Sequence, residues 1–79
     1  MLPELIRAHA RRHPHREAVV AGPQRLSYAE LSRRADALTL LLRSHGAGRG
    51  SVVAVHLGRS ADVVVTVAAV LGTGAAYTV

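Results

Sequence analysis

The last nine residues, Leu71-Gly-Thr-Gly-Ala-Ala-Tyr-Thr-Val79, combine the end of a helix with the start of a strand. Gly72 or Gly74 can end a helix, because glycine readily adopts the left-handed backbone of a C-terminal cap. The valines of Val63–Val67 favour a strand by propensity, but Ala68-Ala69 and the glycines predict a buried helix of about eleven residues. Residues 75–79 then start a strand that has no partner after it. We therefore expect an α/β unit that is incomplete at its C-terminus.

A preceding strand is predicted over Ser51–Leu57, because Val52-Val-Ala-Val55 is typical of a strand buried on both faces. Ser60 is a candidate N-cap for the following helix, with Asp62 in its first turn. A helix between two strands predicts a crossover connection, so we expect parallel pairing between the strands that contain Val52 and Ala76.

Ser27-Tyr-Ala-Glu30 fits a capping box, in which the Ser27 hydroxyl and the Glu30 carboxylate each accept from the other residue's backbone N–H. Apolar residues then recur at spacings of four, three and four and predict one buried stripe: Leu31, Ala35, Leu38 and Leu42. The charged side chains fall largely outside this stripe: Arg33, Arg34, Asp36 and Arg43. Gly46 is expected to end the helix as a left-handed C-cap.

The N-terminal part predicts a helix over Pro3–Arg12, which His13-Pro14 ends because proline disfavours helical backbone in the residue before it. Its apolar stripe is narrow: Leu2, Leu5, Ile6, His9 and Ala10. Glu17–Ala21 is predicted to be a strand, Gly22-Pro23 a turn, and Arg25-Leu26 a short hairpin partner. The full order is thus helix, strand, hairpin partner, helix, strand, helix, strand, in one α/β layer that spans residues 1–79.

Composition excludes several classes of function for this stretch. The net charge is +5, all ten basic residues are Arg, and neither Lys nor Cys occurs. Phosphate-loop, Schiff-base and lysine-dependent ligase chemistry need an amine that arginine does not replace, and a thiolate metal site needs cysteine. Arginine used beside abundant Ala and Val is typical of GC-rich coding, so we do not expect a nucleic-acid partner. No secretory signal follows Met1. The seventeen uncharged residues of Val63–Val79 are at the lower limit of length for a membrane span and contain Gly72 and Gly74, so we expect a cytoplasmic protein.

The remaining candidate sites have simpler explanations. Gly46-Ala-Gly48-Arg-Gly50 follows a helix and precedes a strand, which is the reverse of a dinucleotide-binding loop, and predicts a turn. His9 and His13 have a metal-ligand spacing but lack a third ligand and the glutamate of an H-E-x-x-H motif, so we expect surface histidines, as for His15. His45 lies at a helix end and His56 at a strand end. We assign no catalytic, cofactor-binding or metal-binding residue.

The order of the motifs resembles the N-terminal edge of adenylation domains of nonribosomal peptide synthetases, in the superfamily of acyl-adenylate-forming ligases. The resemblance covers nearly all 79 residues and rests chiefly on Leu26-Ser-Tyr-Ala-Glu-Leu31, Val52-Val-Ala-Val55 and Leu71-Gly-Thr-Gly-Ala-Ala-Tyr77. The family usually has Lys-Ala where Gly72-Thr73 stand, and a proline-led turn where Thr78-Val79 stand. Gly72 within the last helical turn costs about 0.5–1 kcal/mol relative to a better helix former.

The resemblance implies activation of a carboxylic acid with ATP and magnesium to an acyl-adenylate, followed by transfer to the phosphopantetheine arm of a carrier protein. It also implies that the phosphate-binding loop and the catalytic lysine lie beyond Val79, in the rest of the adenylation domain. The position of Met1 at the family's usual domain start suits a loading or free-standing adenylation domain with no condensation domain before it.

We expect the chain alone to be inactive, and to be partly unfolded or self-associating because apolar faces and a strand edge would be exposed. The alternative hypothesis is a small basic binding protein, or a gene remnant, that docks on a synthetase or on RNA without ligase activity.

Overall fold

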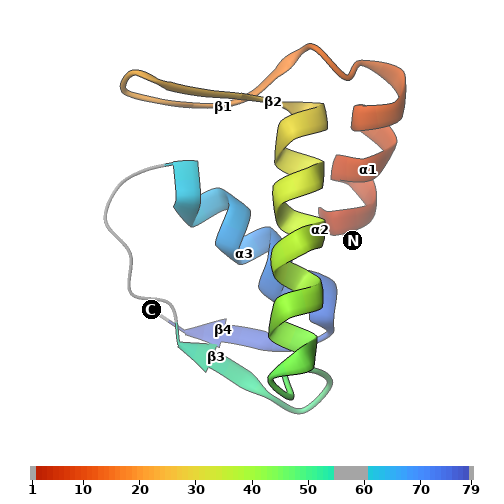
Figure 1. Ribbon diagram of the computed structural model, residues 1–79, viewed down its shortest axis with the longest axis vertical. Coiled ribbons are helices and arrows are strands. Elements are labelled where there is room, and N and C mark those ends of the chain that lie inside the picture. The colour runs from red at the N-terminus through yellow and green to blue at the C-terminus, as the bar shows by residue number, and fades with distance from the viewer. Residues whose placement is uncertain (1, 55–60, 79) are drawn as a thin grey trace.

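The computed structural model describes residues 2–54 and 61–78. The described chain forms three helices and two pairs of strands, in the order that the sequence predicts: α1 (Leu2–Arg12), β1 (Glu17–Ala21), β2 (Gln24–Ser27), α2 (Tyr28–Ser44), β3 (Val52–Ala54), α3 (Ala61–Thr73) and β4 (Ala76–Thr78). Figure 1 shows α2 as the long upright element, with α1 and α3 against it, the β1–β2 hairpin near its first turn and β3–β4 near its last. The predicted α/β class is confirmed.

Both ends of α2 are fixed by the caps that the sequence predicts. Glu30 N donates to Ser27 Oγ and Ser27 N donates to Glu30 Oε1, each over 3.2 Å, which completes the capping box. At the other end, Gly46 has φ of 92° and donates to Arg43 O over 3.0 Å, while Ala47 N donates to Leu42 O over 3.0 Å. This pair of bonds is a Schellman motif, and it satisfies carbonyls that the helix leaves unpaired.

The first pair of strands is an antiparallel hairpin, as predicted. Val19 pairs with Leu26 and Ala21 with Gln24, and Gly22 reaches φ of 60° in the turn between the strands. Leu26 and Val19 are the buried side chains of this hairpin, and they pack on the side of the helices. The hairpin therefore covers one end of the helical core.

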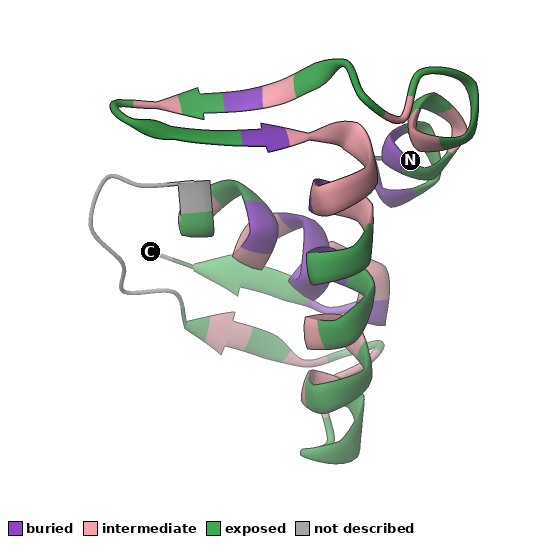
Figure 2. Cartoon of the chain, turned by 45° about the horizontal axis from the view of Figure 1, so that its top comes forward, coloured by how far each residue is buried: buried purple, intermediate pink, exposed green. Residues whose placement is uncertain are grey.

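The second pair of strands is parallel, with Val52 beside Ala76, Val53 beside Tyr77 and Ala54 beside Thr78, which confirms the predicted crossover through α3. The expectation of a strand buried on both faces is wrong for β3. The Val52 side chain is 67% exposed and Ala54 is also exposed, because the described helices cover only the face that carries Val53. Figure 2 shows β3 in the colours of exposed and intermediate residues, whereas α3 carries several buried residues.

The Ser60 cap, His56 and the rest of the predicted strand, residues 55–57, lie outside the described residues. Asp62 is in the first turn of α3, as expected. The helix extends through Gly72 to Thr73, and Gly74 follows it with φ of 89°. Of the two glycines that the sequence offers as helix terminators, Gly74 is therefore the one that ends α3.

The main core lies where α1, α2, α3 and the hairpin meet. It contains seven buried residues: Ile6, Val19, Leu26, Leu31, Ala35, Val65 and Ala68. A smaller cluster joins Val70 and Ala75 to the partly buried Leu42 and Val53. The α2 stripe is confirmed in part, since Leu38 and Leu42 are only half-buried.

The predicted stripe of α1 is wrong in detail. Ile6 is buried, but Leu2 and Leu5 are exposed, because α1 contacts its neighbours along the narrow line through Pro3 and Ile6.

Candidate functional site

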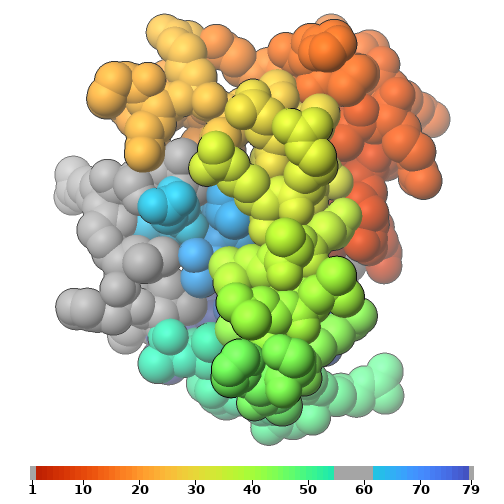
Figure 3. Space-filling model, in the orientation of Figure 1, coloured from red at the N-terminus to blue at the C-terminus, as the bar shows by residue number. Residues whose placement is uncertain are grey.

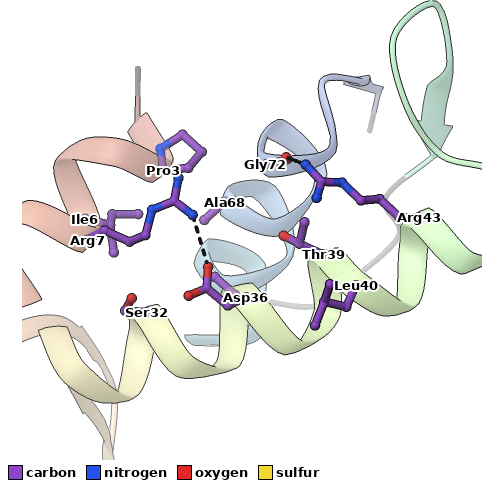
Figure 4. Close-up of a pocket in the computed structure, with 11 residues that line it drawn as sticks. Pro3, Ile6, Arg7, Ser32, Asp36, Thr39, Leu40, Arg43, Ala68 and Gly72 are labelled. Atoms are coloured by element: carbon purple, nitrogen blue, oxygen red, sulfur yellow. Dashed lines mark hydrogen bonds and ion pairs between the residues drawn. The ribbon is translucent and has the colours of Figure 1, made fainter.

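A cavity of about 240 Å³ lies between α1, α2 and α3. Figure 4 shows Pro3, Ile6 and Ala68 on its apolar side, with Arg7, Asp36 and Arg43 at the rim. The cavity combines charge with apolar surface, which is the usual composition of a ligand site. A ligand would also need polar groups in the cavity that are not already paired within the protein.

The polar groups of this cavity are used to join the helices. Arg7 Nη1 lies 3.5 Å from Asp36 Oδ1, which links α1 to α2. Arg43 Nη2 donates to Gly72 O over 2.9 Å, and Thr39 Oγ1 donates to Ala69 O over 3.0 Å, which both link α2 to α3. The Ser32 hydroxyl also lines the cavity and makes no such link among the described residues, but the charged side chains there already join the helices, so the cavity is best described as a helix junction.

The two histidines with metal-ligand spacing do not form a metal site in this structure. Their ring centroids are 6.5 Å apart, and the His9 ring stacks on Tyr28 at 5.0 Å with an interplanar angle of 22°. Residues 2–54 and 61–78 hold no group of three His, Cys, Asp or Glu side chains that could bind a metal ion. The contact between His9 and Tyr28 instead joins the end of α1 to the start of α2, and no sequence pattern pointed to it.

His45 is the C-cap residue of α2 and is exposed, and its Nδ1 lies 3.0 Å from Leu41 O. The imidazole therefore lies against the carbonyl end of the helix, as the sequence predicts. His15 is exposed, as expected.

The carboxylate of Glu30 has a clearly displaced pKa. Hydrogen bonds from Ser27 lower the pKa below its ordinary value of 4.5, and the nearby Arg34 and Arg33 act in the same direction. Stabilising the ionised form suits a capping carboxylate rather than a general acid. This perturbation is therefore explained by the helix start.

The glycine-rich segment is a helix-to-strand turn, as predicted. Ser51 N donates to Gly48 O over 3.0 Å, Gly48 N donates to Ser51 Oγ over 3.2 Å, and Gly50 has φ of 86°. The glycine-rich turn connects α2 to β3 and does not begin a helix, so its geometry is unlike a dinucleotide-binding loop.

None of the described helices has the length and apolar character needed to cross a membrane.

Residues 6–79 match the family of AMP-binding enzymes. The chain belongs to this family. Among relatives, it is 45% identical over 76 residues to the dimodular nonribosomal peptide synthase of Bacillus subtilis (strain 168), covering 96% of this chain and 3% of that protein. It is 43% identical over 77 residues to tyrocidine synthase 3 of Brevibacillus parabrevis, covering 98% of this chain and 1% of that protein.

Solved structures of the family agree with this assignment. The crystal structure of the nonribosomal peptide synthetase FmoA3, in its form bound to α-methyl-L-serine-AMP, superposes with a TM-score of 0.91 at 39% identity, over 98% of this chain and 9% of that one. The N-terminal subdomain of NpsA from Klebsiella oxytoca superposes with a TM-score of 0.88 at 25% identity, over 96% of this chain and 20% of that one.

These relatives confirm the resemblance inferred from the motif order. The chain spans only a small share of the length of each relative, and its matches include nonribosomal peptide synthetases. It therefore corresponds to a short segment of an adenylation domain of nonribosomal peptide synthesis.

Proposed function

We propose that residues 1–79 are the N-terminal part of the large subdomain of an adenylation domain, which activates an amino acid with ATP and Mg²⁺. In that reaction the substrate carboxylate attacks the α-phosphate of ATP and pyrophosphate leaves. The phosphopantetheine thiol of a carrier protein then attacks the acyl carbon of the aminoacyl-adenylate, so that a thioester forms and AMP leaves. The observation that carries the proposal is the TM-score of 0.91 with FmoA3, whose structure holds an aminoacyl-AMP. ATP and a carrier protein as substrates suit a cytoplasmic enzyme.

In this proposal the segment contributes structure and the rest of the adenylation domain contributes the chemistry. The 79 residues contain no lysine, and the side chains of Arg7, Asp36 and Arg43 at the α1–α2–α3 junction are engaged in contacts between the helices. The rest of the domain would supply the phosphate-binding loop, the catalytic lysine and the residues that hold Mg²⁺. It is therefore the part of the protein against which this segment would pack. The chain alone is then inactive.

The test is a chimera in which these residues replace the matching segment in the adenylation domain of the B. subtilis dimodular synthase, with which the chain shares 45% identity. Amino-acid-dependent exchange of pyrophosphate into ATP is measured for the chimera, the parent domain and the 79-residue chain. We expect the chimera to retain the amino-acid preference of its parent, and the chain alone to show no exchange above background.

Two further results would count against the proposal. Exchange by the 79-residue chain alone would show that the chemistry lies within it. A chimera that folds like its parent, by circular dichroism and gel filtration, but has lost exchange would show that the segment does not play the structural part assigned to it. A variant of the parent that lacks the segment is the control for its necessity.

A further inference from the structure

A cluster of arginine and histidine side chains lies where α1 ends and the chain turns toward β1. Between Glu4 and Glu17 the sequence has four of the ten arginines, three of the five histidines and no carboxylate. We define the basic surface as five exposed residues at this point: Arg11, Arg12, His13, His15 and Arg16. The segment forms part of one end of the molecule in Figure 3, where it appears in orange.

The backbone beneath the basic surface is fixed by hydrogen bonds to both neighbouring helices. His13 N donates to His9 O over 2.7 Å, which continues α1. Tyr28 N donates to Arg16 O over 2.9 Å and Ala29 N donates to Pro14 O over 3.1 Å, so two donors of the first turn of α2 are satisfied by this segment. The cationic side chains therefore extend from a held backbone, which reduces the entropy that a partner must overcome on binding.

The charges of this surface are not neutralised within the described structure. Glu17 pairs with Arg25 over 2.7 Å, Asp36 pairs with Arg7, and Glu30 caps α2. Within residues 2–54 and 61–78, no ion pair or side-chain hydrogen bond engages Arg11, Arg12 or Arg16. The negative end of the α1 dipole accounts for cations in its last turn, but Arg16 lies beyond the helix. Like charges held this close repel one another.

We propose that the basic surface docks the carboxylate-rich face of a protein partner. The arginine fork pairs with carboxylates through two parallel hydrogen bonds, so three exposed arginines on a held backbone suit an acidic protein surface. This chain covers only 1–3% of tyrocidine synthase 3 and of the dimodular synthase. The matching segments of those two synthases are therefore surrounded by much more protein. A single-stranded nucleic acid would need aromatic rings for stacking, whereas the Tyr28 ring is already stacked with His9. This inference goes beyond the proposed adenylation function and does not depend on catalysis.

The test uses a fluorescein-labelled peptide of ten glutamates as the acidic probe, titrated with the chimera at low and at physiological salt. The variant Arg11→Gln/Arg12→Gln/Arg16→Gln removes the arginines of the surface. The matched control, Arg33→Gln/Arg34→Gln/Arg49→Gln, removes three exposed arginines elsewhere and lowers the net charge by the same amount. A DNA duplex of similar charge is titrated in parallel.

We expect the surface variant to weaken peptide binding about tenfold or more and the control to weaken it less than about threefold, with both effects shrinking as salt rises. Equal losses in the two variants would overturn the proposal, because net charge alone would then explain binding. No peptide binding, or tighter binding of the duplex through the same three arginines, would overturn it too. The hydrogen bonds that hold this backbone segment involve no arginine side chain, so we expect the variants to fold. Unchanged far-UV circular dichroism of each variant chimera verifies this.

Discussion

Thr39 on α2 occupies the space that a side chain on Gly72 of α3 would need. A Cβ placed on Gly72 would lie 2.8 Å from Thr39 Oγ1, closer than real Cβ atoms come to a neighbour. The same hydroxyl donates to Ala69 O, and Arg43 donates to Gly72 O. Gly72 thus permits a close crossing of two helices. Its low helix propensity is offset by contacts that only this crossing allows.

The first prediction concerns this crossing. Gly72→Ala should lower the free energy of unfolding by about 1 kcal/mol or more, because Thr39 is β-branched and has little freedom to move away. In a Thr39→Ala background the same change should be neutral or stabilising by up to about 1 kcal/mol, because alanine is the better helix former. Urea unfolding of the dilute chain, followed by far-UV circular dichroism, gives the coupling free energy between the two positions from the original chain, the two single variants and the double variant.

Gly48→Ala is the matched glycine control for the crossing, since a Cβ there would meet its nearest neighbour, Thr73 O, at an ordinary 3.9 Å. Additive effects of the changes at Thr39 and Gly72 would contradict the contact.

The second prediction concerns the start of α2. Ser27→Ala removes the oxygen that accepts from Glu30 N, so we expect a loss of about 1 kcal/mol in unfolding free energy. Ser27→Asp keeps an acceptor at the N-cap and should recover most of this loss. Thermal unfolding of the three proteins measures both effects, and a Ser27→Ala variant as stable as the original chain would be inconsistent with a functioning cap.

The third prediction is a pH dependence that arises from Glu30. Hydrogen bonds from Ser27 lower the pKa of its carboxylate in the folded chain, so folding favours the ionised form. The resulting stability is fully present above the unfolded pKa, near 4.5, and is lost as pH falls through the lower folded pKa. The Glu30→Gln variant keeps a side-chain acceptor at N3 but does not ionise in this range. The stability difference between the original chain and this variant should therefore shrink when unfolding is measured at falling pH.

A constant difference between these two proteins across the acidic range would show that Glu30 does not contribute through its charge. Asp36→Asn is a useful comparison, because it removes another exposed carboxylate that has a basic partner but no capping role.

The fourth prediction is that the 79-residue chain self-associates through the β3–β4 pair. Val52 is 67% exposed and Tyr77 43% exposed, on a two-stranded sheet of a kind that is rarely stable without further strands. Val52→Lys should lower the average mass measured by sedimentation at a given concentration. Leu41→Lys, at a residue 55% exposed on α2, is the matched control and should change the mass less. A chain that stays monomeric as its concentration is raised would contradict the prediction.

The sequence by itself determined the caps, the turns and the pairing of strands. The Ser27–Glu30 box, the Gly46 cap and the Gly22-Pro23 turn are satisfied within a few residues along the chain, so local chemistry is enough to predict them. The parallel pairing of Val52 with Ala76 followed from a helix between two strands, because a crossover of that length permits little else.

Only the tertiary structure decided which apolar residues are buried, what lies beside Gly72 and what holds the backbone under the basic surface. Leu5 and Val52 have the same apolar character as Ile6 and Val70, yet the first two are exposed and the others buried. Burial depends on which element packs against a face, and that element comes from a distant part of the sequence. The same holds for the space beside Gly72, which Thr39 fills from 33 positions earlier in the chain, and for the backbone that presents the basic surface, which the first turn of α2 holds in place.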